Sequence, residues 1–203
     1  MYRKFAFLAC ALVAGTFTLQ AQQTPAPPDS MYEYKLLSTS KTSTLQQEMS
    51  ELAEAGFRFQ SVVGGGTVLG GNEAVVVMGR PKSGLVPQRY KYLLLATQKI
   101  ETMERELQSA ANDGYEFKGQ TVLGSTLLGK EVVIILERDS TAIVERWEYR
   151  LLSTKRTATM EKELKAIADL GFEFVGATIA GSSLTGGSDV ITITRRRIRS
   201  PYM

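Results

Sequence analysis

A threefold internal repeat constrains the fold of this chain more than any other feature. Residues 32–80, 90–138 and 147–195 align residue by residue, without an insertion or a deletion. Positions shared by all three copies include Tyr34/Tyr92/Tyr149, Gly56/Gly114/Gly171, Phe59/Phe117/Phe174 and Arg80/Arg138/Arg195. Self-similarity at a fixed spacing marks a chain built from copies of one supersecondary unit. A unit of about 50 residues is marginally stable alone, so we expect the copies to bury apolar surface against one another.

Each copy predicts the same order of elements. Residues 32–37 alternate like a half-buried strand, and residues 45–53 carry apolar side chains at helical spacing. Gly56 stands where this helix must end, and Phe57 and Phe59 return to the period of a strand. The apolar residues 74–78 form a third strand. We therefore predict an α+β fold of three tandem βαββ units, each a three-stranded mixed sheet with one helix on one face.

The pattern also gives finer expectations. Thr44, Thr102 and Thr159 precede the apolar stripe, where a hydroxyl would cap the helix. The third strand is apolar on both faces in the first two copies, so we place it in the centre, between two mutually parallel strands. We expect Tyr32, Tyr34 and Leu36 to face the helix. Thr192 and Thr194 replace apolar residues on the opposite face, which predicts a third unit that is more exposed than the others.

The N-terminus resembles an export signal. Arg3 and Lys4 precede an apolar run over residues 5–19, which is shorter than the roughly 20 residues of a membrane-spanning helix. We expect residues 1–21 to be a cleaved signal peptide, residues 22–31 a Pro-rich tether, and the mature protein to be periplasmic or secreted. Cys10 lies in the middle of the apolar run rather than at its end, which argues against a lipoprotein. No transmembrane segment is expected after cleavage.

Composition excludes several kinds of chemistry. Loss of Arg3 and Lys4 leaves 22 of the 24 basic residues against 21 acidic ones, so the mature chain is nearly neutral. This balance argues against nucleic acid as a partner. The chain has no histidine, and its one cysteine is Cys10. A mature chain without imidazole or thiol lacks the commonest general base and the commonest metal ligands, and we assign no catalytic, cofactor-binding or metal-ligating residue.

Two sets of residues remain as candidate contact sites. Leu69, Leu127 and Leu184 recur in the glycine-bearing loops before each third strand. They either fold back to cap the core of their hairpins or form a row of apolar contacts for a partner. Residues 196–203 form a basic tail, and Arg195, Arg196, Arg197 and Arg199 could bind a polyanion.

These residues also carry a family resemblance. The opening segment YEYKLL (residues 32–37), the helix end AGFRF (residues 55–59) and the apolar strand ending at Arg80 resemble the bacterial domain of unknown function 4177. The resemblance covers each copy whole. It implies a fold but no catalytic residue or cofactor, because that family has no established activity. Many members have Trp after the turn glycine, where this chain has Phe57, Tyr115 and Phe172.

The leading functional hypothesis is therefore a non-enzymatic binding or structural module of the cell envelope, with an unknown protein or envelope component as its partner. One alternative is a hydrolase that works without His or Cys, which a single deep pocket with a polar cluster specific to one copy would favour. The other alternative is a polyanion-binding protein that uses the basic tail.

Overall fold

The computed structural model describes residues 31–66, 72–82, 89–97, 99–125, 129–181 and 188–198. These residues contain three helices and nine strands, so the α+β class is confirmed. The elements are β1 (Tyr32–Thr39), α1 (Thr42–Glu54), β2 (Arg58–Gly66), β3 (Asn72–Pro81), β4 (Tyr90–Thr97), α2 (Ile100–Asn112), β5 (Glu116–Ser125), β6 (Gly129–Asp139), β7 (Trp147–Thr154), α3 (Thr157–Ala168), β8 (Glu173–Gly181) and β9 (Ser188–Arg197). The first unit comprises β1, α1, β2 and β3, and the second and third units follow in the same order.

The last strand of each unit lies in the centre of its sheet, as expected. β3 pairs with both β1 and β2, β6 with both β4 and β5, and β9 with both β7 and β8. Every one of these pairings is antiparallel. The prediction of mixed sheets is therefore wrong: the two outer strands of a unit run parallel to each other but never pair, because the third strand separates them.

The first two sheets are joined at one point. Asn72 of β3 pairs with Gly124 of β5, which makes one six-stranded sheet of the first two units. The third sheet, in the order β7-β9-β8, stays separate. Backbone pairing between units thus links the first two units and does not include the third.

The helices begin earlier than the apolar stripe suggests. Their N-cap residues are Lys41, Lys99 and Arg156, and no side chain caps them. The predicted capping by Thr44, Thr102 and Thr159 is wrong, since these residues lie inside the first helical turn. The apolar stripe marks the part of each helix that meets a sheet, and the helix continues beyond it toward the preceding strand.

The helix ends follow the prediction. Gly56, Gly114 and Gly171 have φ values of 84°, 83° and 83°, a left-handed conformation that side chains with a Cβ disfavour. A Cβ added at Gly171 would meet no heavy atom within 4 Å, whereas one added at Gly114 would lie 3.2 Å from Val144.

This difference makes a matched pair of substitutions informative. Gly171→Ala should lower the free energy of unfolding by about 1–2 kcal/mol, because only the left-handed backbone opposes the methyl group. Gly114→Ala should cost more, since the methyl group also presses on Val144. Urea denaturation of both variants checks this, and a neutral Gly171→Ala variant would contradict the backbone argument.

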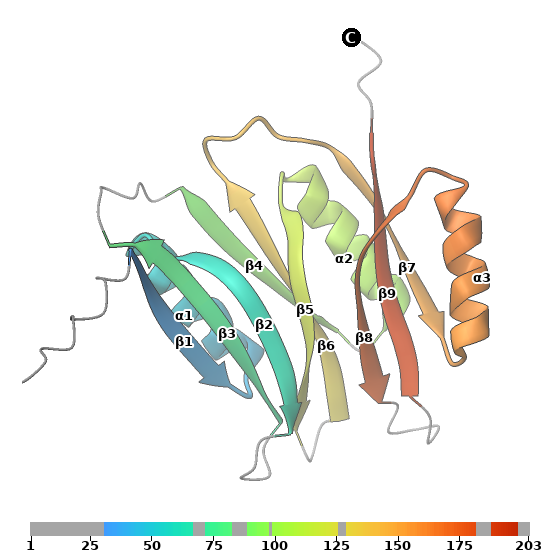
Figure 1. Ribbon diagram of the computed structural model, residues 1–203, viewed down its shortest axis with the longest axis horizontal. Helices are drawn as coiled ribbons and strands as arrows, with labels where there is room; N and C mark the ends of the chain where they lie inside the picture. The colour runs from blue at the N-terminus through green and yellow to red at the C-terminus, as the bar shows by residue number, and fades with distance from the viewer. Residues whose placement is uncertain are drawn as a thin grey trace, which may run out of the picture.

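Sheets and helices alternate along the molecule. Figure 1 shows α1 between the first and second sheets, α2 between the second and third, and α3 at the far end. Two hydrophobic cores result. In the first, Leu45 and Met49 of α1 and Val76 of β3 pack with Leu94 and Ile135 of the second unit. In the second core, α2 takes the same position between β6 and the third sheet. α1 and α2 therefore each cover their own sheet and the next one.

This layering corrects one sequence-based expectation. Tyr34 and Leu36 pair with Gly79 and Val77, so they lie on the opposite face of the first sheet from Val76 and Met78, which pack on α1. Tyr32, Tyr34 and Leu36 therefore point away from their own helix. Their equivalents in the later units meet the helix of the preceding unit, and the described residues contain no helix before the first unit.

The alignment of the third copy is also wrong by one residue beyond β8. Tyr92 pairs with Glu137 in the second unit, but the equivalent Tyr149 pairs with Arg195 rather than Thr194. Contacts made by arginine agree with this shift: Arg80 pairs with Glu33, and Arg196, not Arg195, pairs with the equivalent Glu148. The connection from β8 to β9 is thus one residue longer than its counterparts, and the third unit ends at Arg196.

The shift turns Thr192 and Thr194 toward α3. Both are fully buried, contrary to the expectation that they lie on an exposed face. Ile191 and Ile193 take the opposite face and join the core beneath α2. A one-residue change of register moves every side chain of a strand to the other face of its sheet.

Candidate functional site

The structure describes only some of the predicted contact residues. Leu69, Leu127 and Leu184 lie outside the described residues, as do Arg199 and the expected signal peptide. Both readings of the leucine loops therefore remain predictions.

The arginines at the end of β9 are described, and each has an acidic partner. Arg195 pairs with Glu173 at 2.6 Å, Arg196 with Glu148 at 2.7 Å and Arg197 with Glu145 at 2.6 Å. Two of them also stack on aromatic rings, Arg195 on Trp147 and Arg196 on Phe172. Their guanidinium groups thus serve to attach β9 to its surroundings, and a polyanion would have to compete with three carboxylates.

The junctions between units are the most regular interaction sites of the molecule. At the first junction the Phe59 N–H of β2 donates to the Tyr92 hydroxyl at 2.7 Å. At the second, the Phe117 N–H donates to the Tyr149 hydroxyl at 3.0 Å. Phe59 also covers Gly119, where an added Cβ would lie 3.1 Å from its ring, and Phe117 covers Gly176 in the same way.

Side chains of α1 and α2 also form hydrogen bonds with backbone groups at the edge of the next sheet. Gln46 of α1 donates to the Tyr92 carbonyl at 2.8 Å and accepts from the Leu94 N–H at 2.7 Å. On α2, Gln108 lies one turn beyond the position equivalent to Gln46, and it makes a similar pair of bonds with the Trp147 carbonyl and the Tyr149 N–H. The outer edges of β4 and β7 are thus closed by side chains rather than by another strand.

A polar cluster specific to the second unit lies at the first junction. The Glu137 side chain is 2% exposed and binds Arg58 at 2.9 Å and Lys118 at 3.6 Å. It also accepts from the Tyr92 hydroxyl at 2.8 Å. The aligned positions in the other units are Gly79 and Arg195, so sequence reasoning missed this site. The one signal in the sequence is that Glu137 directly follows the apolar run of residues 132–136, where the first copy has Gly79.

A cavity of about 160 Å³ adjoins this cluster and is lined by Arg58, Gly114, Glu116, Lys118, Glu137, Asp139, Ala142, Ile143, Val144 and Glu145. Its lining residues include no hydroxyl or thiol nucleophile. Burial raises the pKa of the nearby Tyr92 hydroxyl, which therefore stays protonated and acts as a donor to Glu137. The carboxylates of Glu116, Glu137, Asp139 and Glu145 each face a basic side chain within 4 Å. The arrangement is that of a neutralised ion-pair network.

The outer face of the first sheet has the opposite character. Tyr34 is 58% exposed, whereas the equivalent Tyr92 and Tyr149 are 5% and 1% exposed. Leu36 is 69% exposed, but Leu94 and Leu151 are buried. Val63 of β2 is also largely exposed on this face. The first sheet thus presents to solvent the side chains that the other two units bury.

These observations define a repetitive α+β protein with an apolar surface left open at one end. Among the described residues, no helix is long and apolar enough to cross a membrane, and no three potential metal ligands converge. Comparison with protein-family models, with curated proteins and with solved structures gave no match.

Proposed function

We propose that the chain is an exported, non-enzymatic binding module, built from three tandem βαββ repeats, that acts through the outer face of its first sheet. The exposure of Tyr34 and Leu36 carries this proposal, because their equivalents are buried wherever a neighbouring unit is present. An apolar patch that the protein's own architecture covers elsewhere is the kind of surface that a protein partner covers. Export follows from the N-terminal sequence alone.

The cavity beside Glu137 favours binding over catalysis. Its acidic groups are paired with Arg58, Lys118, Arg89 and Arg197, so none is set apart as a general acid or base. A hydrolase without His or Cys would need a carboxylate or amine that is free to act as nucleophile or base, and each carboxylate that lines this cavity is held in an ion pair. The hydrolase alternative called for a polar cluster specific to one copy, and the Glu137 cluster is specific to the second unit. We assign this cluster a structural role, because its bonds join the first and second units.

Photocrosslinking in cells tests the proposal. A photoreactive residue at position 36 should form specific protein adducts, whereas one at position 143 should not. Ile143 is the matched control, since it is 92% exposed but lies in the connection between the second and third units. Equal crosslinking from both positions, or none from position 36, would refute a binding role for this face.

A further inference from the structure

We infer that the partner of this face is a second copy of the chain, stacked head to tail. In this arrangement the first sheet of one copy covers α3 and β8 of the next. The inference rests on the proposed function, because it names the occupant of the surface proposed above. It follows from the internal junctions, which show how such a face is covered by a chain of this sequence.

The two ends of the molecule are the two halves of one such junction. At one end stands the outer face of the first sheet, with Tyr34, Leu36 and Val63 exposed. At the other end stand α3 and β8, whose Phe174 and Ile179 are 56% and 65% exposed. The equivalent helices α1 and α2 are covered on their far side by the next sheet, whereas no described strand covers that side of α3 (Figure 1).

Tyrosine and phenylalanine are matched across these ends. In both internal junctions a tyrosine hydroxyl accepts from the N–H of a phenylalanine in the preceding unit. Tyr34 is the equivalent tyrosine of the first of the three units, and Phe174 is the equivalent phenylalanine of the third. Neither takes part in an internal junction of this kind. Head-to-tail stacking would bring the Tyr34 hydroxyl to the Phe174 N–H.

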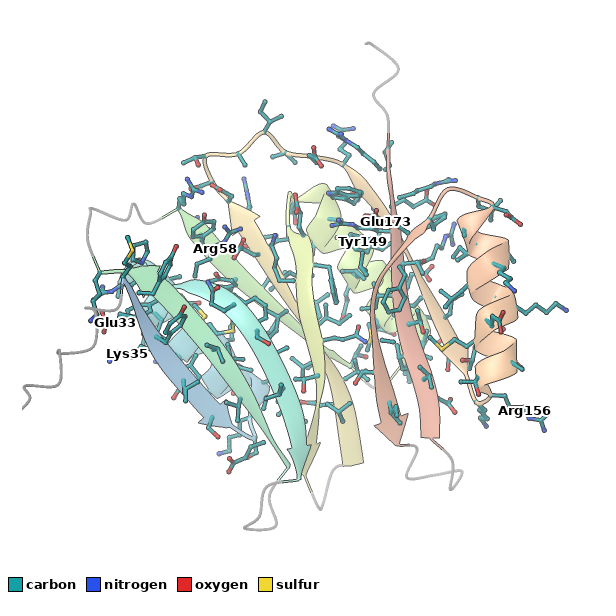
Figure 2. All side chains as sticks on the ribbon, viewed as in Figure 1. Glu33, Lys35, Arg58, Tyr149, Arg156 and Glu173 are labelled. Atoms are coloured by element: carbon teal, nitrogen blue, oxygen red, sulfur yellow. The ribbon has the colours of Figure 1, made fainter. Side chains whose placement is uncertain are left out.

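The charges on α3 and β1 are complementary as well. At the second junction, Glu104 of α2 accepts from the Leu151 N–H at 2.9 Å and pairs with Arg150 at 3.3 Å. Glu161 of the third unit occupies the position of Glu104, and Lys35 and Leu36 of the first unit occupy the positions of Arg150 and Leu151. Stacking would therefore pair Glu161 of one copy with Lys35 and the Leu36 N–H of the next. Figure 2 shows Lys35 at one end of the molecule and Arg156, just before α3, at the other.

One position differs from the internal pattern and gives the inference a distinctive test. Gly119 and Gly176 receive the rings of Phe59 and Phe117, and a Cβ at Gly176 would lie only 2.8 Å from the ring of Phe117. The same position in the first unit is Ser61. The Phe174 ring would have to shift to accommodate it, so Ser61→Gly should strengthen the association severalfold.

The geometry also fixes the kind of assembly. Two different surfaces meet in a head-to-tail contact, so each copy keeps one free end and further copies can add. Such an interface produces open filaments or closed rings. A twofold dimer would require the first sheet to pack on its own counterpart.

Sedimentation velocity of residues 22–203, which contain every described element, tests the inference over a range of concentrations. The parent chain should form species larger than a dimer as its concentration rises. Leu36→Asp and Phe174→Asp should each weaken association about a hundredfold or more, because each places a charge in the apolar contact. Ile143→Asp is the control and should behave like the parent. Both end residues are mostly exposed, and circular dichroism verifies that the variants fold.

The decisive measurement is the equimolar mixture of the two end variants. One variant keeps an intact α3 end and the other an intact β1 end, so the mixture should form a dimer and nothing larger. A parent chain that stays monomeric at millimolar concentration would overturn the stacking, and so would loss of association by Leu36→Asp but not by Phe174→Asp, the mark of a twofold dimer. Association that appears only after removal of residues 22–30 would also overturn it, because that segment would then be the occupant.

Failure of the stacking and failure of the binding role remain distinguishable. Adducts from position 36 that contain a different protein would keep the proposed function and exclude self-association. Adducts that join position 36 to α3 or β8 of a second copy would support both. A Ser61→Gly variant that associates more weakly than the parent would contradict the assigned register of the contact.

Discussion

Leu107→Ala should destabilise the protein by about 3 kcal/mol, the largest effect that we expect from a single substitution. Leu107 is fully buried in α2, where it packs between the second and third sheets. Truncation of a buried leucine loses the transfer free energy of its methyl groups. It also leaves a cavity, because the two sheets on either side of the helix can relax only partially into the space. Urea denaturation followed by circular dichroism measures the change.

The repeat supplies a matched control for this substitution. Leu164 occupies the same position in α3, but it is only partly buried, because the part of the chain that the structure describes has no further sheet over that helix. Leu164→Ala should cost about 1 kcal/mol, in proportion to the smaller apolar area that it removes from contact. Equal costs for the two substitutions would show that α2 gains no stability from the sheet of the following unit.

Glu137→Ala should cost about 2 kcal/mol. The substitution removes the acceptor of the Tyr92 hydroxyl and of three hydrogen bonds from Arg58, and it leaves that hydroxyl buried without its carboxylate. Loss of a fully buried ion pair costs about 3–5 kcal/mol. The Arg58 side chain is 45% exposed and returns to water, which reduces the effect here.

Glu116→Ala is the control for the same cluster. Glu116 contacts Lys118 at 3.7 Å and is 34% exposed, so its removal should change the free energy of unfolding by less than about 0.5 kcal/mol. The comparison separates the contribution of a buried carboxylate to stability from that of a carboxylate in a surface ion pair. If both substitutions were equally mild, the Glu137 network would contribute little to the junction between the first two units.

Much of the fold could be predicted from the sequence, because its signals are local. The apolar spacing along α1 and the glycine at position 56 define a helix and its end, and both occur three times. The central place of the third strand followed from its apolar character on both faces. These features depend on the residues of one unit alone.

What could not be predicted depends on contacts between units. The residues of β1 alternate, but alternation does not say whether Tyr34 or Leu37 faces the helix of the same unit. In β9, the segment VITIT (residues 190–194) presents apolar and threonine side chains in turn, so a shift by one residue leaves no visible error in the sequence. Only the pairing with β7 and the contacts of Arg196 reveal it.

The candidate site was missed for the same reason. A search for catalytic residues looks for nucleophiles and bases, whereas the open surface consists of Tyr34, Leu36 and Val63, which resemble core residues in every respect except exposure. Their significance appears only when the same position is compared across three units in three different environments.

The alternation of sheet and helix has a consequence for the length of such chains. Because the junctions of α1 and α2 close the next sheet with the same kinds of bond, a gene duplication that added a unit between the second and third would need no new type of interface. The number of units can therefore vary while the two end surfaces stay the same. Selection would then act separately on the number of middle units, which sets the length of the molecule, and on the residues of the two end surfaces.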